Sequence, residues 1–134
     1  MVSRLLPGLR YPRLWWVIGA GLVALVAYLS LTPEPIDSGD VGGHDPGHFI
    51  AYLTLMLWFA QLLRPGWGRV VAAVALVGLG VGLEFAQGLT TWRTFDVADM
   101  LDDGIGVAVG FLLAMTPLGG ALAALERRLG AAAG

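Results

Sequence analysis

The chain of 134 residues has room for one domain, and 57% of its residues are hydrophobic while only 13% are charged. Soluble domains have about 45–50% apolar and about 25% charged residues, so this composition excludes an ordinary soluble domain and also a disordered chain. The absence of cysteine excludes disulfides and thiolate chemistry, and the net charge of −2 favours no nucleic-acid partner.

Four apolar stretches follow one another along the chain, each near the length of about 17–25 residues that a helix needs to cross a bilayer. The first covers residues 14–32, and its length and lack of an A-x-A cleavage site favour a retained helix over a signal peptide. The others cover residues 47–63, 70–89 and 99–125. The sequence therefore predicts an all-α fold, an integral membrane four-helix bundle made by residues 1–134 as one domain.

Proline and glycine mark the breaks between these stretches. Pro33 ends the first helix because proline cannot continue it. Asp45 followed by Pro46 predicts the start of the second helix, with an aspartate cap and proline in the first turn. Residues 64–69 predict a tight turn between the second and third helices. Pro117 predicts either a kink in the fourth stretch or the end of its membrane-embedded part.

The arginines indicate an orientation. Cytoplasmic loops of membrane proteins are enriched in Lys and Arg, and seven of the eight arginines fall on one side if four helices alternate. These seven are Arg4, Arg10, Arg13, Arg64, Arg69, Arg127 and Arg128. The other side carries Arg93 and nine of the ten acidic residues. We therefore predict that both termini are cytoplasmic and that the opposite end of the bundle is strongly acidic.

Polar side chains recur at that acidic end of the second, third and fourth helices. An ionisable group at membrane depth is costly, which makes it a candidate for function. Within each helix the polar residues are three or four positions apart and so share a face, and we expect the three faces to meet in one pocket. The predicted binding residues are Asp45, His48, Tyr52, Glu84, Gln87, Arg93, Asp96, Asp99 and Asp103.

Two further patterns bear on this site. Small residues at Gly106, Gly110 and Ala114 predict that another helix approaches the fourth helix closely. Arg93 is expected to pair with a carboxylate, with Asp96, Asp99 or Glu84 as its partner, or to bind a phosphate. The first pattern concerns packing, and the second concerns ligand binding.

No metal or cofactor is predicted. The segment from His44 to His48 superficially resembles the H-E-x-x-H zinc motif, but Pro46 in the first helical turn leaves His44 outside the helix, so a zinc-protease site is not expected. A carboxylate site for Ca²⁺ or Mg²⁺ stays open as an alternative, since both ions prefer oxygen ligands.

The order of these residues resembles the VanZ-like family of bacterial membrane proteins. The resemblance is carried by two blocks within residues 42–113: Asp45, His48, Phe49 and Tyr52, then Glu84, Gln87, Arg93, Asp99, Gly106 and Gly110. Where the family has lysine and asparagine, this chain has Pro46 and Asp103, so its pocket is expected to be more negative. The resemblance implies a multi-pass protein of the bacterial cell membrane, related to a protein of teicoplanin resistance.

Three classes of function are left open. The first is a protein that modulates the interaction of glycopeptide antibiotics with the cell envelope, or that binds a lipid-linked or peptidoglycan-precursor ligand. The second is a membrane-embedded acid–base enzyme acting on a lipid-linked substrate, with Glu84, His48 and Asp99 as the catalytic candidates. The third is a small proton- or cation-coupled transporter. A chain this short would need to form a homo-oligomer in order to transport.

Overall fold

The computed structural model describes residues 8–133, and over that range the chain is entirely helical and loop, which confirms the predicted all-α fold. Its elements in chain order are α1 (Pro12–Leu31), α2 (Pro46–Leu62), α3 (Trp67–Gly88), α4 (Val97–Ala114), a 3-10 turn η2 (Pro117–Gly120) and α5 (Ala121–Ala132). Arg4 of the predicted arginine-rich side lies outside the described residues.

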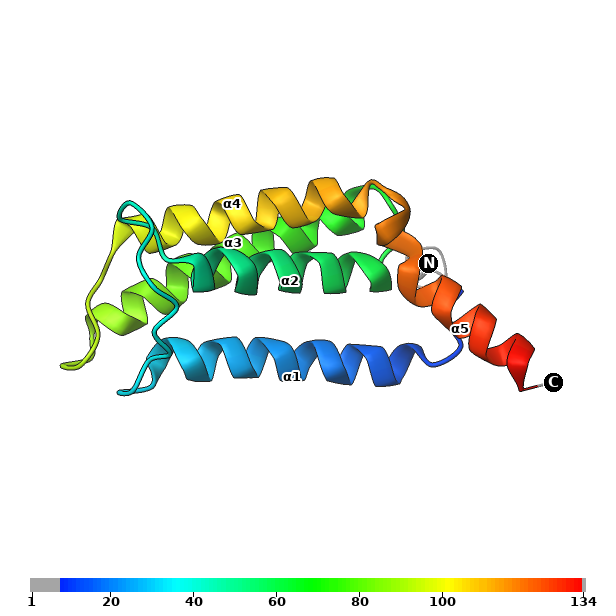
Figure 1. The fold of residues 1–134 in the computed structure, drawn as a ribbon, viewed down its shortest axis with the longest axis horizontal. Coiled ribbons are helices and arrows are strands. Elements are labelled where there is room, and N and C mark those ends of the chain that lie inside the picture. The colour runs from blue at the N-terminus through cyan, green and yellow to red at the C-terminus, as the bar shows by residue number, and fades with distance from the viewer. Residues whose placement is uncertain (1–7, 134) are drawn as a thin grey trace.

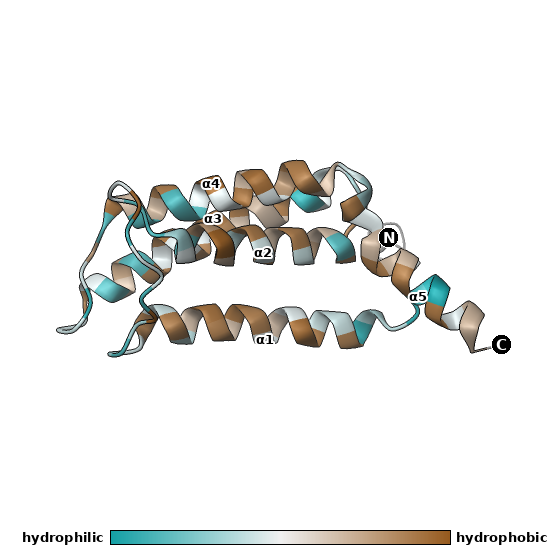
Figure 2. Cartoon of the chain, in the orientation of Figure 1, coloured by the Kyte–Doolittle hydropathy of each residue, from teal (hydrophilic) through white to brown (hydrophobic). Residues whose placement is uncertain are grey.

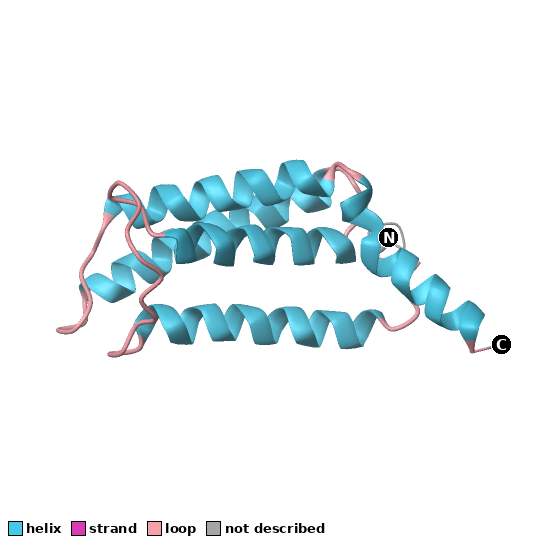
Figure 3. Ribbon diagram, in the orientation of Figure 1, coloured by secondary structure: helices cyan, strands magenta, loops and turns pink. Residues whose placement is uncertain are grey.

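Helices α1 to α4 lie alongside one another, and the connecting loops gather at their two ends (Figures 1 and 3). The loops of residues 32–45 and 89–96 lie at one end, which we call the acidic end. The start of α1, the α2–α3 turn, η2 and α5 lie at the other, which we call the arginine end. Hydrophobic residues occupy the middle of the helices between these ends (Figure 2).

Local chemistry sets the helix starts. The Asp45 side chain accepts a hydrogen bond from the Gly47 backbone N–H at 2.7 Å, and Pro46 opens α2, as predicted. Asp96 caps α4 in the same way, accepting from the Ala98 N–H at 2.8 Å. The third helix begins earlier than predicted, because Pro65 and Gly66 complete the turn, with Gly66 at a φ of 122°. Residues 67–69 are therefore helical, and the predicted turn over 64–69 is too long.

The predicted fourth helix, residues 99–125, is interrupted at Pro117, where the sequence predicts a kink or an end. Helix α4 ends at Ala114, and the chain continues through η2 into α5 with a bend of 79°. Pro117 causes the break because it lacks the N–H that a continuing helix would use. The Thr116 Oγ1 accepts from the Leu118 N–H at 3.3 Å and so caps the new turn. The described chain thus has four long helices and a short fifth one.

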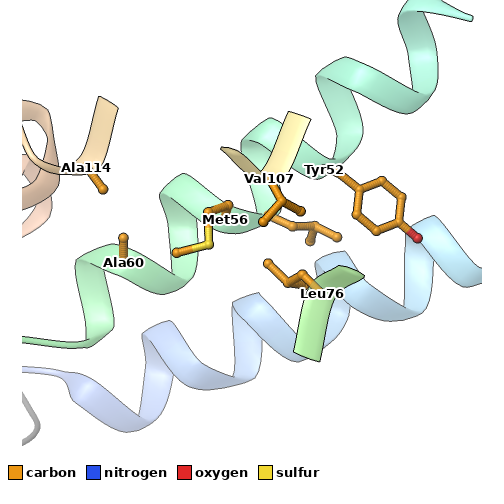
Figure 4. Close-up of a cluster of buried hydrophobic side chains, with 7 residues drawn as sticks. Tyr52, Met56, Ala60, Leu76, Val107 and Ala114 are labelled. Carbon is orange, nitrogen blue, oxygen red and sulfur yellow. The ribbon is translucent and has the colours of Figure 1, made fainter. Parts of the chain in front are cut away.

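The closest helix pair is α2 and α4, and glycine makes the approach possible. A Cβ atom on Gly106 would lie 2.4 Å from the Phe49 carbonyl oxygen, and one on Gly110 would lie 2.7 Å from the Leu53 carbonyl oxygen. The predicted close approach along this face of the fourth helix is confirmed. Tyr52 belongs to a cluster of buried hydrophobic side chains, and its hydroxyl points away from the aliphatic members of that cluster (Figure 4).

Two helices of the described chain, α1 and α3, are long and apolar enough to cross a membrane individually. The α4–α5 segment would be a third if the bent pair is counted as one broken span. Helix α2 has 17 residues and is shorter than these. Length and composition therefore support a membrane protein, while the number of spans is not settled by them.

An arginine is buried at the arginine end. Arg69, which is 6% exposed, donates to the carbonyl oxygens of Leu63 at 3.1 Å, Ala114 at 2.7 Å and Gly119 at 3.1 Å. Helices end with carbonyls that lack partners, and here one guanidinium satisfies carbonyls at the ends of α2 and α4 and in η2. Arg69 is therefore part of the structure of this end, not the loop charge that the sequence predicts.

Glu126 joins α5 to the start of α1. Its carboxylate accepts hydrogen bonds from the backbone N–H groups of Arg10 and Tyr11 and from the Trp15 indole at 2.6 Å. Burial raises the pKa of Glu126, but these hydrogen bonds outweigh it and hold the pKa below its usual value. The carboxylate is thus ionised at neutral pH and ties α5 to the segment that leads into α1.

Candidate functional site

His48 is the centre of the polar cluster at the acidic end. It lies near the start of α2, and its imidazole is held between two carboxylates of α4. The Nδ1 atom is 2.8 Å from Asp103 Oδ1, a hydrogen-bond distance, while Nε2 is 3.5 Å from Asp99 Oδ2. Asp99 and Asp103 are four residues apart and so share the helix face that meets α2.

Helix α3 packs against the Asp103 side chain. Asp103 is buried, and a Cβ atom on Gly80 of α3 would lie 2.6 Å from Asp103 Oδ2. The absence of a side chain at Gly80 therefore makes room for the carboxylate that orients His48. This role of Gly80 could not be inferred from the sequence, because α3 contains several glycines among similar apolar neighbours in the sequence.

The segment before α2 is tied to α4 by Asp102. The Asp102 carboxylate is 2.7 Å from His44 Nδ1 and accepts from the Asp45 backbone N–H at 2.9 Å. Asp45 also accepts a hydrogen bond from the Ser38 hydroxyl. Sequence reasoning missed these roles of Ser38 and His44 because loop residues show no periodicity that could place them, and that of Asp102 because its partners lie in this loop. His44 lies outside the helix, as predicted.

Asp45, His48 and Asp99 bring three possible metal-ligating atoms together. One carboxylate oxygen of each aspartate and one imidazole nitrogen lie within 4.8 Å of one another. All three residues are partly buried. The residues come from the loop before α2, from α2 and from α4, so the fold and not the local sequence creates the group.

Glu84 and Gln87 make contacts that hold neighbouring segments in place. Glu84 is 1% exposed and accepts from the backbone N–H of Asp96 at the start of α4. Gln87 is equally buried and donates to the Ser30 carbonyl oxygen at 2.7 Å, near the end of α1. Asp96 itself is exposed and caps α4. These three predicted site residues surround the His48 cluster without lining the cavity beside it.

That cavity lies between the outer ends of α1 and α2 and has a volume of about 190 Å³. Its polar lining includes Asp45, His48, Tyr52 and Arg93. The Arg93 Nη1 atom is buried and has no hydrogen-bond partner within the described chain. None of the ion pairs of residues 8–133 joins Arg93 to the carboxylates expected for it. A buried donor without a partner is costly.

Comparisons with known proteins give little further identification. No family model matches the chain, and no solved structure matches it. The chain is 31% identical over 96 residues to an uncharacterized protein of the fission yeast Schizosaccharomyces pombe. This similarity covers 69% of the chain and 57% of the length of the yeast protein, so the chain spans little more than half of that relative.

These findings overturn the resemblance to the bacterial VanZ-like family. The absence of a matching family model and the similarity to a eukaryotic protein give that assignment no support. The residues that carry the resemblance also have plain structural roles here. Asp45 caps α2, Gln87 binds the end of α1, and Gly106 allows α2 to approach. The association with teicoplanin resistance, with glycopeptides and with bacteria is withdrawn together with the family.

Proposed function

We propose that the chain is a multi-pass membrane protein with four spans, whose termini are cytoplasmic and whose acidic end faces the opposite side. Two spans have support from length and composition alone. Helix α2 is the shortest and packs against α1, α3 and α4, and its 17 residues extend about 25 Å, near the hydrocarbon thickness of a bilayer. The exposed arginines Arg10, Arg13, Arg64, Arg127 and Arg128 lie at the arginine end.

A pair of reporter fusions tests this topology. A reporter fused after Gly134 is expected to be active only as a cytoplasmic reporter, and one inserted after Gly42 in the loop of the acidic end only as an external one. Accessibility labelling of the same two positions provides an independent reading. Opposite locations support an odd number of spans between the two positions, which the four-span topology assigns to α2, α3 and α4, whereas the same location for both would contradict that topology.

The cavity at the acidic end binds the polar head group of a membrane-resident amphiphile that carries an anion such as phosphate. The observation behind this proposal is the buried, unpartnered Nη1 of Arg93, which lies in a polar cavity at the end of the bundle. A guanidinium matches a phosphate or carboxylate with two parallel hydrogen bonds. The volume of about 190 Å³ is below the 300–1,000 Å³ typical of pockets that enclose a whole ligand, so it suits a head group.

The lining of the cavity also supports an amphiphile. Val26 and Leu29 of α1 and Ala51 of α2 form its apolar wall, beside the carboxylate of Asp45 and the hydroxyl-bearing Tyr52. The ligand would therefore meet hydrocarbon on one side and hydrogen-bonding groups on the other. Because α1 is largely exposed along its length, a chain attached to the head group could continue along it into the lipid.

Replacing Arg93 with alanine is expected to reduce the occupancy of a co-purifying phosphate-bearing lipid at least tenfold, because the anion loses the guanidinium that would bind it. Native mass spectrometry of the full chain in detergent, followed by lipid extraction, measures this occupancy. Arg128→Ala, at an exposed arginine of the opposite end, is the matched control and should retain the lipid. Equal occupancy in the two variants would contradict the proposal.

An acid–base enzyme acting on the same ligand is a second candidate, because His48 is held between the carboxylates of Asp99 and Asp103. A histidine oriented by a carboxylate can accept or donate a proton at its other nitrogen. Glu84 lies behind this pair and binds a backbone N–H, so the enzymatic role would fall to His48 and Asp99.

A further inference from the structure

We propose that Asp45, His48 and Asp99 form a binding site for a divalent transition-metal ion of the Zn²⁺ or Mn²⁺ class. The proposal deepens the function proposed above, since the ion would stand beside the head-group cavity, but it is tested with the metal alone. The three ligand atoms come from separate elements and lie within 4.8 Å of one another. One ion placed between them would be reached by all three.

The contact of His48 with Asp99 is an ion pair whose length also suits two ligands of one metal ion. Their atoms Nε2 and Oδ2 are 3.5 Å apart, which is long for a hydrogen bond. The other nitrogen of the same ring is 2.8 Å from Asp103, so this cluster does form close contacts where it can. With metal–ligand distances of about 2.0–2.1 Å, tetrahedral ligands lie about 3.4 Å apart. The longer contact therefore matches two ligands of one ion.

Asp103 supplies the outer partner that metal-binding histidines usually have. A ligating histidine generally donates its second ring N–H to a carboxylate or a carbonyl, which fixes the tautomer and the ring orientation. The Asp103 carboxylate has this position at His48 Nδ1, and Gly80 packs against its other oxygen. Nε2 is thereby directed toward Asp99.

One carboxylate oxygen of Asp45 and the Nη1 atom of Arg93 give the site a second feature. Asp45 uses Oδ1 for the Gly47 N–H and for Ser38, so Oδ2 remains for an ion. Arg93 lines the same cavity as Asp45 and His48 and presents a buried Nη1 without a partner in the described chain. A metal bound by two carboxylates and one imidazole has open positions, and an anion bridging the metal and Arg93 would occupy one of them.

The ligand types select the class of ion. Imidazole suits Zn²⁺ and other transition metals, while carboxylates suit Mn²⁺ and the hard cations. Ca²⁺ and Mg²⁺ prefer sets of oxygen ligands, and a histidine at the centre of the group disfavours them. The Ca²⁺ or Mg²⁺ alternative left open by the sequence is therefore replaced by Zn²⁺ or Mn²⁺.

The test uses the full chain, without a polyhistidine tag, stripped of metal in detergent and titrated with Zn²⁺ and with Mn²⁺ by calorimetry. We expect one ion per chain, with an affinity that falls at least tenfold in Asp99→Asn and about 10–100-fold in Asp103→Asn. Asp37→Asn, in the exposed loop of the same end, should bind as the wild type does. His44→Gln should also retain binding, which would exclude the neighbouring His44–Asp102 pair.

Co²⁺ substitution gives a reading that does not depend on affinity. Its visible absorption should show a bound ion with an imidazole ligand, and this signature should be lost in His48→Gln, which serves as a second variant if Asp99→Asn does not fold. A wild-type chain that binds neither Zn²⁺ nor Mn²⁺, or variants of both His48 and Asp99 that bind as the wild type does, would overturn the site. Metal binding without a co-purifying lipid would support the metal site and contradict the head-group function, and the reverse result would do the opposite.

Discussion

Replacing Arg69 with methionine is expected to lower the free energy of unfolding by at least about 3 kcal/mol, because it leaves buried carbonyl groups without a donor. The guanidinium donates to Leu63, Ala114 and Gly119, which belong to three different elements at the arginine end. Methionine fills much of the same space but offers no N–H group. Each carbonyl would then lose a charge-assisted hydrogen bond in a place that water does not reach freely.

Chemical or thermal unfolding of the purified chain in one detergent measures this effect. Arg69→Lys keeps the positive charge but not the planar fork of donors, so we expect an intermediate loss of stability. Arg128→Ala changes an exposed arginine of α5 and should alter stability by no more than about 0.5 kcal/mol. If Arg69→Met were as stable as Arg128→Ala, the guanidinium would not hold these elements together.

Arg69 also shows why parts of this fold were out of reach of sequence reasoning. An arginine that follows Gly66 and Gly68 and precedes an apolar run has the pattern of a loop charge. Its carbonyl partners arise because Pro117 breaks the chain after α4, some 45 residues further along the sequence. Hydropathy predicts where helices exist, but the partners of their terminal carbonyls depend on how the ends meet in space.

The contacts of the candidate site also differ in whether the sequence alone could predict them. Spacings of four residues placed His48 with Tyr52, and Asp99 with Asp103, on single helix faces, and helical geometry alone suffices for such an inference. Which faces meet depends on packing, and the link from His44 to Asp102 lies between a loop and a helix. Loop residues carry no periodic signal, so contacts of this kind could be found only in the structure.

The rejected family assignment has a physical explanation as well. Its pattern consists of a few polar residues and glycines at helical spacing within apolar segments. In this chain Gln87 binds the end of α1, Glu84 binds the start of α4, and Gly106 admits the backbone of α2. Any bundle of apolar helices with polar ends needs caps, buried hydrogen bonds and close approaches of this kind. The pattern can therefore arise from helix packing alone and is not by itself a sign of common descent.

Replacing Gly106 with alanine is expected to lower the free energy of unfolding by about 2–3 kcal/mol, the cost of inserting a methyl group into a well-packed contact. The new Cβ would lie 2.4 Å from the Phe49 carbonyl oxygen and 3.1 Å from the Leu53 nitrogen. Both atoms belong to the backbone of α2, which cannot turn aside as a flexible side chain could. Helices α2 and α4 must therefore move apart.

The same displacement should reach the site, because it separates the two helices that hold His48 and Asp103 at 2.8 Å. Metal affinity and thermal stability of Gly106→Ala are thus expected to fall together. Gly104→Ala is the matched control, since a Cβ at Gly104 meets nothing within 4 Å, and alanine favours a helix over glycine by up to about 1 kcal/mol. The control should be as stable as the wild type or more so. Equal stability of the two variants would mean that α2 and α4 do not pack through backbone contact at Gly106, and the cluster at the acidic end would then lack the close approach that aligns it.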